Sequence, residues 1–168
     1  MLRWTAALAA FLVLAIPATA QQHTNMPGMD TQETRSNAPF RPGLGDLMTA
    51  FVQPHHIKLG LAGAAQNWPL ADYELDELKE TFDTVAKLIL KHGRLSIPEA
   101  IKSTVVQPLD AVDAAIKAKD PAAFTKAYVD LTSACNACHQ SAAHPMIVIK
   151  VPDISGTAFP DQDFNPLK

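Results

Sequence analysis

Apolar residues recur every three or four positions over four stretches of the chain, and this spacing predicts four helices. The expected spans are 44–66, 69–91, a third that begins at 97 and stays apolar on one side to 116, and 121–143. Each is about twenty residues long and the links between them are short, which favours an all-α, up-down-up-down four-helix bundle.

Prolines and capping residues mark the ends and weak points of these spans. Ser96-Ile97-Pro98-Glu99 has the pattern of a capping box at the start of the third helix. Asp120-Pro121 supplies a cap and a first-turn proline for the fourth. Gly93 is expected to stop the second helix. Pro54 and Pro108 lie inside the first and third spans and should bend them.

One face of each helix is expected to point into the core. The residues on these faces are Leu44, Met48, Phe51, His55, Leu59 and Ala62 in the first span, and Leu70, Glu74, Leu78, Phe82, Val85 and Ile89 in the second. In the third span they are Ile101, Val105, Leu109, Val112 and Ile116, and in the fourth Phe124, Tyr128, Leu131, Cys135, Cys138 and Ala142.

The two ends of the chain do not follow the helical pattern. Residues 1–20 have a basic start at Arg3, an apolar run and an Ala18-Thr19-Ala20 cleavage signal, which predicts a secretory signal peptide and a periplasmic protein. Residues 21–42 are polar and broken, and predict a flexible linker before a domain at 43–168. After His144 the chain becomes an irregular tail, which we expect to lie along the bundle without building a sheet.

Charge and composition exclude several classes of protein. The net charge of −3 leaves no basic patch for nucleic acid, whereas a mildly acidic surface would suit a basic redox partner. After residue 20 no apolar run reaches the length of a membrane-spanning helix, so no stable membrane insertion is expected once the signal is removed. No catalytic triad or phosphate-binding loop is present, so an enzyme is not predicted.

The chemistry is concentrated in Cys135-Asn136-Ala137-Cys138-His139. This C-x-x-C-H spacing is typical of covalent attachment of one haem c. On a helix, positions i, i+3 and i+4 share a face, so Cys135, Cys138 and His139 should point the same way. The two thiols would form thioethers with the porphyrin, and His139 would be the proximal ligand of the iron.

Other roles for this pair of cysteines fit less well. A dithiol redox site of the thioredoxin kind would need a βαβ context, which the helical pattern does not provide. A zinc site could use both cysteines with His139 and His144, but structural zinc usually draws its ligands from two separate clusters. A disulfide within one helix would be strained.

The motif and its place in the last predicted helix make the chain resemble the cytochrome c-prime superfamily, and more closely a group of bacterial cytochrome c family proteins. Over residues 44–150 the elements that carry the resemblance are His56-Ile57-Lys58-Leu59, Asn67-Trp68, Leu70-Ala71, Tyr73-Glu74 and the run 131–139. The resemblance implies a haem near the end of the fourth helix and a second axial ligand from the first helix. It also suggests, by analogy, a homodimer paired through the first two helices.

The second axial ligand is predicted to come from Met48, His55 or His56. His56 matches the resemblance and is placed first as the distal ligand of the haem iron. His55 lies better on the apolar face and is its rival, because Pro54 leaves the helical phase uncertain by one residue. A pair of surface histidines is the remaining alternative. Glu74 or Glu77 would hold the second ring nitrogen of a ligating histidine, unless both are solvated.

Two further sites are weaker hypotheses. Lys58 is a candidate partner for a haem propionate, although a solvated lysine is as good an interpretation. His23, Met26 and Met29 are a mixture of donors that suits copper, although the segment also fits a plain linker. The predicted function is therefore electron transfer by an exported monohaem cytochrome. The alternative is a haem protein with an open distal site that binds nitric oxide, carbon monoxide or peroxide.

Overall fold

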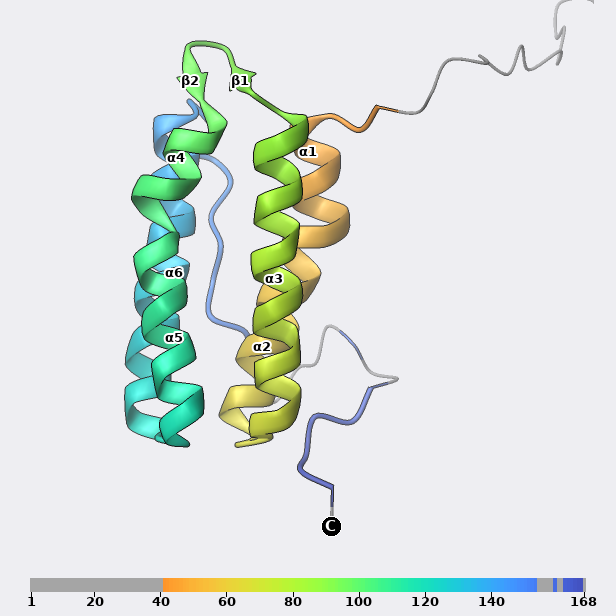
Figure 1. Ribbon diagram of the computed structural model, residues 1–168, viewed down its shortest axis with the longest axis vertical. Helices are drawn as coiled ribbons and strands as arrows, with labels where there is room; N and C mark the ends of the chain where they lie inside the picture. Colours follow the sequence, from red (N-terminus) through yellow and green to blue (C-terminus); the bar gives the residue numbers. More distant parts are fainter. Residues whose placement is uncertain (1–40, 154–158, 160–161, 168) are drawn as a thin grey trace, which may run out of the picture. The chain divides into compact units, whose positions relative to one another are not determined.

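The computed structural model describes residues 41–153, 159 and 162–167, which all belong to one compact unit. Helices dominate it, so the predicted all-α class is confirmed (Figure 1). Their bounds are α1 Leu44–Leu47, the π-helix η1 Met48–Val52, α2 Gln53–Ala64, α3 Trp68–Leu88, α4 Ile97–Thr104, α5 Val106–Ala118 and α6 Pro121–Ser141. Within the described residues, the strands are a two-residue pair, β1 Lys91–His92 and β2 Leu95–Ser96.

The first predicted helix is present as α1, η1 and α2 in direct succession. A π turn lies just before Pro54, and the Gln53 N–H bonds to the Met48 carbonyl five residues back. Proline has no N–H to give to the carbonyl four residues earlier, so a wider turn here relieves the conflict. Because a π turn takes up one extra residue, it rotates α2 relative to α1 by about one position.

This rotation overturns part of the predicted inner face. Phe51 is half exposed, and the first buried positions after Leu47 are Val52, His56 and Leu59. The face that ran through Phe51 and His55 is therefore wrong, because it assumed an unbroken α-helical period. Leu59 and Ala62, beyond the π turn, are buried as predicted.

The second predicted helix corresponds to α3, which begins after Asn67 and has Pro69 in its first turn. Its buried residues include four predicted ones, Glu74, Leu78, Phe82 and Val85. The helix ends at Leu88, so the predicted stop at Gly93 is wrong. Gly93 instead forms the turn of the β1–β2 hairpin, where its φ of +58° is one that glycine adopts without strain.

The third predicted helix is divided at Val105 into α4 and α5. Pro108 explains the break. In a continuous α-helix its ring would clash with the Thr104 carbonyl, and it has no N–H to donate to that carbonyl. Ser96 does occupy the N-cap position, but its side chain makes no capping hydrogen bond, so the predicted capping box does not form. The predicted apolar face from Ile101 to Ile116 is buried throughout.

In the fourth helix, α6, the predicted cap is present, since the Asp120 side chain accepts hydrogen bonds from the N–H groups of Ala122 and Ala123. α6 packs against α5 and α2, and α3 packs against α2 and α5. Two glycines of α2 allow the close approach of α6, because a Cβ at Gly60 would meet Tyr128 and one at Gly63 would meet Phe124.

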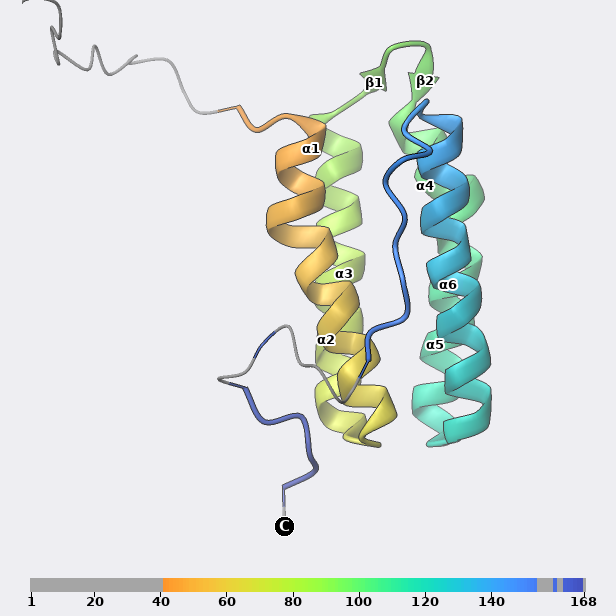
Figure 2. The ribbon, with the colours of Figure 1, turned by 180° about the vertical axis from the view of Figure 1, so that it is seen from behind.

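The tail after α6 runs back along the helices without forming a strand in its described part, as predicted (Figure 2). It is fastened at Asn136, which bonds to Ile149, and near Gly60, which lies close to Pro152. None of the helices in the described residues is long and apolar enough to cross a membrane.

Candidate functional site

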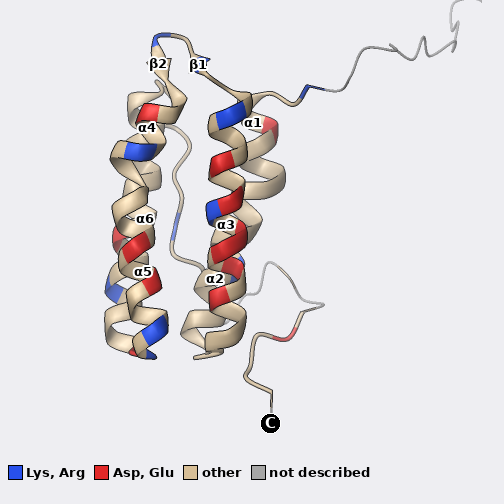
Figure 3. Ribbon diagram, viewed as in Figure 1, with Lys and Arg blue, Asp and Glu red and all other residues tan. Residues whose placement is uncertain are grey.

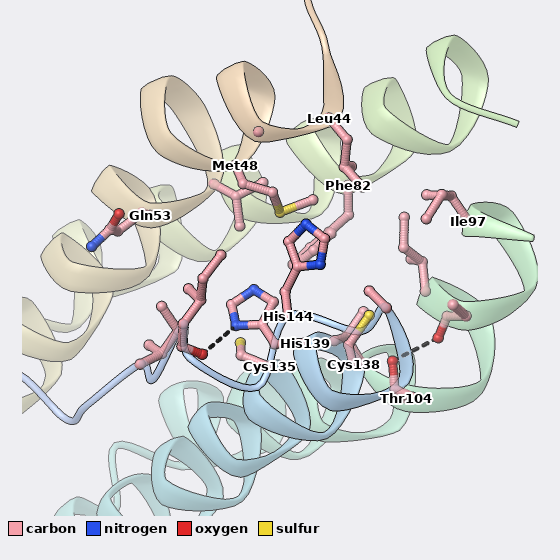
Figure 4. Close-up of a pocket in the computed structure, with 18 of the residues that line it drawn as sticks. Leu44, Met48, Gln53, Phe82, Ile97, Thr104, Cys135, Cys138, His139 and His144 are labelled. Atoms are coloured by element: carbon pink, nitrogen blue, oxygen red, sulfur yellow. Dashed lines mark hydrogen bonds between the residues drawn. The ribbon is translucent and has the colours of Figure 1, made fainter. Parts of the chain in front are cut away.

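Cys135, Cys138 and His139 line a single pocket at the end of α6 (Figure 4). The cavity volume is about 180 Å³, and the pocket opens to solvent at its mouth. The walls come from α1, η1, α2, α3, α4, α6 and the tail, and most of the lining side chains are apolar. The geometry that the C-x-x-C-H spacing predicts is therefore present: both sulfurs and the imidazole meet in one cavity.

Both cysteines are free thiols. Burial raises the pKa of Cys135 to about 11, and nearby Cys138 adds to this effect. Burial also raises the pKa of Cys138, opposed by a hydrogen bond with Thr104. The thiols are therefore neutral at ordinary pH, because a thiolate in an apolar cavity without a nearby positive charge would be strongly destabilised.

The His139 ring is oriented by the backbone of the tail. Its Nδ1 lies 3.0 Å from the Ile147 carbonyl oxygen, and since a carbonyl only accepts, Nδ1 carries the proton. In the neutral imidazole, Nε2 is then the nitrogen with a lone pair that could bind a metal. A metal-ligating histidine is usually held in this way, with its other N–H donated to a carbonyl or carboxylate.

Asn136, inside the motif, fixes the segment that supplies this carbonyl. Its side-chain amide donates to the Ile149 carbonyl at 2.9 Å and accepts from the Ile149 N–H at 2.7 Å. The pair of bonds clamps the tail to α6 two residues beyond Ile147. The sequence analysis missed this role, and the only signal was a side chain with both donor and acceptor between the two cysteines.

Of the two neighbouring histidines in α2, His56 lines the pocket. Its side chain is 3% exposed, and its ring stacks on the Tyr128 ring with the two centroids 4.8 Å apart. Burial lowers the pKa of His56 to about 4. Thr132 gives its own proton to the Tyr128 carbonyl, so its Oγ1 accepts from His56 Nε2 at 3.1 Å. Tyr128 Oη donates to the His56 carbonyl at 2.6 Å and lies 3.1 Å from Nδ1.

His55 and Lys58 point elsewhere and are not among the residues that line the pocket. His55 Nδ1 lies 2.8 Å from a carboxylate oxygen of Glu74, which is almost fully buried between α2 and α3. Lys58 Nζ is 3.9 Å from the other oxygen of Glu74 and also lies over the Phe159 ring. Glu74 thus holds His55, the histidine outside the pocket. Glu77 is hydrogen-bonded to Tyr73, whose pKa it raises.

Met48, the third donor considered in the first helix, also lines the pocket, and Figure 4 shows its side chain projecting into it. Phe82 of α3 is a further lining residue. Trp68 instead packs edge-on against Phe124 in the core, and Tyr73 is mostly exposed. The structure therefore brings Met48 and His56 together with the C-x-x-C-H motif in one pocket, and leaves His55 and Lys58 outside it.

Two other histidines in the pocket were missed as a pair by the sequence analysis. His144 follows α6, and His92 lies on β1 with its ring centroid 5.1 Å from that of His144. Among the described residues, no group of three or more histidine, cysteine or acidic side chains is arranged to hold a metal ion, so the zinc alternative gains no support there. The candidate copper donors His23, Met26 and Met29 lie outside the described residues.

No protein-family model matches this chain, and neither a curated protein nor a solved structure is similar enough to count as a match.

Proposed function

We propose that this protein is an exported c-type cytochrome that carries one covalent haem and transfers electrons. The observation that supports the proposal best is the convergence of two thiols and an unprotonated imidazole nitrogen on one apolar pocket. That combination is what covalent haem attachment through C-x-x-C-H requires.

The residues present fit the group. Cys135 and Cys138 would hold the ring through thioethers. His139 would bind the iron through Nε2, while the Ile147 carbonyl holds the opposite ring nitrogen, Nδ1, and so orients the imidazole. When bound, haem supplies an iron that alternates between the ferric and ferrous states. The lining of the pocket is mostly apolar, and burial is one of the means by which a protein sets the potential of such an iron.

Residues of η1 and α2 line the pocket and could supply a second ligand to a bound haem. Met48 and His56 are the first-helix donors that line the pocket there, and we propose His56 as the distal ligand. Its nearly complete burial keeps it neutral, which is the form that binds iron. To bind through Nε2, His56 must give up its hydrogen bond to Thr132.

The same hydrogen bonds favour a second candidate function, the binding of a small ligand at an open distal position. Both ring nitrogens of His56 lie within hydrogen-bonding distance of Tyr128 or Thr132. If those bonds persist in the haem-loaded protein, the sixth position stays free for nitric oxide, carbon monoxide or peroxide.

The finer features of the fold belong to the same proposal. We infer an up-down-up-down four-helix bundle in which α1–η1–α2, α3, α4–α5 and α6 are the four members, supported by the packing of α2 on α3 and of α5 on α6. Cleavage after Ala20, periplasmic location, a redox partner protein and pairing of two copies through the first two helices are proposed on the sequence and the resemblance alone.

The proposal is tested by producing the full chain in a host that matures c-type cytochromes. We expect haem that stays with the polypeptide after denaturation, and loss of this covalent haem when Cys135 and Cys138 are both replaced by Ala. Exported, correctly processed protein without any covalent haem would refute the proposal.

The two functions are separated by ferric and ferrous absorption spectra with and without carbon monoxide. A low-spin ferrous spectrum that ignores carbon monoxide and is lost in His56→Ala, with His55→Ala as the matched control, supports electron transfer with His56 as ligand. A carbon monoxide-sensitive, high-spin spectrum in the unmutated protein supports ligand binding and rejects His56 as the distal ligand.

A further inference from the structure

His144 and His92 form a polar edge in a pocket that is otherwise mostly apolar. No lysine, arginine, aspartate or glutamate is among the described residues that line it. Among the buried side-chain nitrogen and oxygen atoms of the described residues, His144 Nδ1 is the one without a hydrogen-bond partner. Figure 4 shows the His144 imidazole inside the pocket, on a different side of the cavity from Gln53.

The backbone is arranged to bring His144 to this position. Ala143 adopts φ of +62°, a left-handed conformation that is unfavourable for a residue with a Cβ. The turn is closed by hydrogen bonds from the Ala143 N–H to the Gln140 carbonyl and from the His144 N–H to the His139 carbonyl. This is the Schellman pattern, normally built with glycine, and it folds His144 back over the end of α6.

A second turn presents His92 at the same edge. The β1–β2 hairpin places His92 opposite Leu95 and reverses at Gly93, whose φ is also positive. Lys91 and Arg94 in this hairpin are exposed and do not line the pocket, but they add positive charge at this end (Figure 3). Two separate left-handed residues thus bring two imidazoles into contact at one edge of the cavity.

The haem of the proposed function would need hydrogen-bond donors for its carboxylates, and this edge could supply them. Haem carries two carboxylates, and a buried carboxylate is strongly destabilised unless donors reach it. Of the other histidines in the pocket, His139 is assigned to the iron, and His56 is bonded to Thr132 and is proposed for the distal position. Gln53, which also lines the pocket, is an exposed residue of α2. Lys58 is engaged with Glu74 outside the pocket.

We propose that the His144–His92 edge binds the haem propionates, with the Nδ1–H of His144 as the main donor and His92 packed against it. This inference rests on the proposed function and identifies where in the pocket the carboxylate end of the haem lies. It replaces Lys58 as the propionate partner. A neutral imidazole carries one N–H, which is enough for the hydrogen bond.

The test compares covalently loaded, full-length protein in three forms: unmutated, His144→Leu and His144→Asn. Asparagine offers an amide N–H close to the position of Nδ1, whereas leucine offers none. Resonance Raman spectroscopy reports the propionate bending band. We expect the band to shift in His144→Leu and to stay in place in His144→Asn, and the midpoint potential to fall in His144→Leu as the carboxylate loses its donor.

Lys58→Met is the matched control, and it should leave both the band and the potential unchanged. An unchanged band in His144→Leu would overturn the inference, as would a shift in Lys58→Met alone. These results require haem to be attached, so they are distinct from failure of the proposed function, in which the unmutated chain would carry no covalent haem.

Discussion

Adjacent residues in α2 have opposite surroundings. His55 is partly exposed and bonded to the buried carboxylate of Glu74, whereas His56 is buried among Tyr128, Thr132 and the pocket. The His55–Glu74 bond joins α2 to α3 and the His56 bonds join α2 to α6. Together these bonds fix the rotation of α2 about its axis, so that His56 and not His55 faces the pocket.

The burial of His56 predicts a loss of stability in weak acid. In the full chain without haem, unfolded His56 binds a proton as the pH falls below 6.5, but folded His56 stays neutral until the pH reaches about 4. The shift is worth about 3 kcal/mol of unfolding free energy, present above pH 6.5 and lost as the pH falls toward 4.

Urea unfolding of the unmutated chain and of His56→Gln, each at pH 7.5 and 4.5, would measure this effect. Carboxylates titrate in both proteins, so their contribution cancels in the difference. The stability advantage of the unmutated chain over His56→Gln should shrink at the lower pH. A pH-independent difference for His56→Gln would contradict the prediction.

At the scale of elements, α2 and α6 can approach each other closely because α2 has two glycines where they meet. A Cβ at Gly63 would lie 2.0 Å from a ring carbon of Phe124, and one at Gly60 would lie 2.6 Å from Tyr128. Both contacts are shorter than atoms tolerate, and both partners are buried rings with little room to move.

Gly63→Ala should therefore destabilise the protein by about 1–3 kcal/mol, although alanine is the better helix former by up to about 1 kcal/mol. Gly45→Ala is the matched control, because it lies in α1 with nothing within 4 Å of the added Cβ. Thermal or urea unfolding of the two variants should give shifts of opposite sign, or no shift for Gly45→Ala. Stabilisation by Gly63→Ala would show that α6 does not approach α2 this closely.

At the scale of the whole molecule, the pocket is closed by segments far apart in the chain. The first helix, the hairpin and α4 form part of its wall, and α6 with the returning tail forms the rest. The tail is held to α6 through the two Asn136–Ile149 bonds, and it presents the Ile147 carbonyl to His139.

Asn136→Ala should release the tail. Two hydrogen bonds at roughly 0.5–1.5 kcal/mol each predict a loss of about 1–3 kcal/mol. Amide hydrogen exchange should become faster at Ile149, with amides in the middle of α6 unaffected. Ser133→Ala, on the same helix with an exposed bond to its own backbone, is the control and should leave Ile149 protected. Unchanged exchange at Ile149 in Asn136→Ala would mean that other contacts hold the tail.

Much of this architecture could be predicted from local signals. The apolar period of three to four residues located the helices because each buries one face. Asp120 and Pro121 marked the start of α6 because their chemistry acts within one turn. The shared direction of Cys135, Cys138 and His139 followed from helix geometry alone. The end of α3 was misplaced, because the β1–β2 hairpin follows it, and the third span is divided at Val105 where Pro108 was expected only to bend it.

The sequence by itself therefore determined the helical class, the approximate helical spans and the grouping of Cys135, Cys138 and His139, since all of these depend on residues close together in the chain. Only the tertiary structure decided that His56 lines the pocket and His55 does not, because one π turn before Pro54 shifts the helical phase by a residue. It also decided that Asn136 orders the tail, that Ile147 orients His139, and that His144 meets His92. Those contacts join segments that no local periodicity connects.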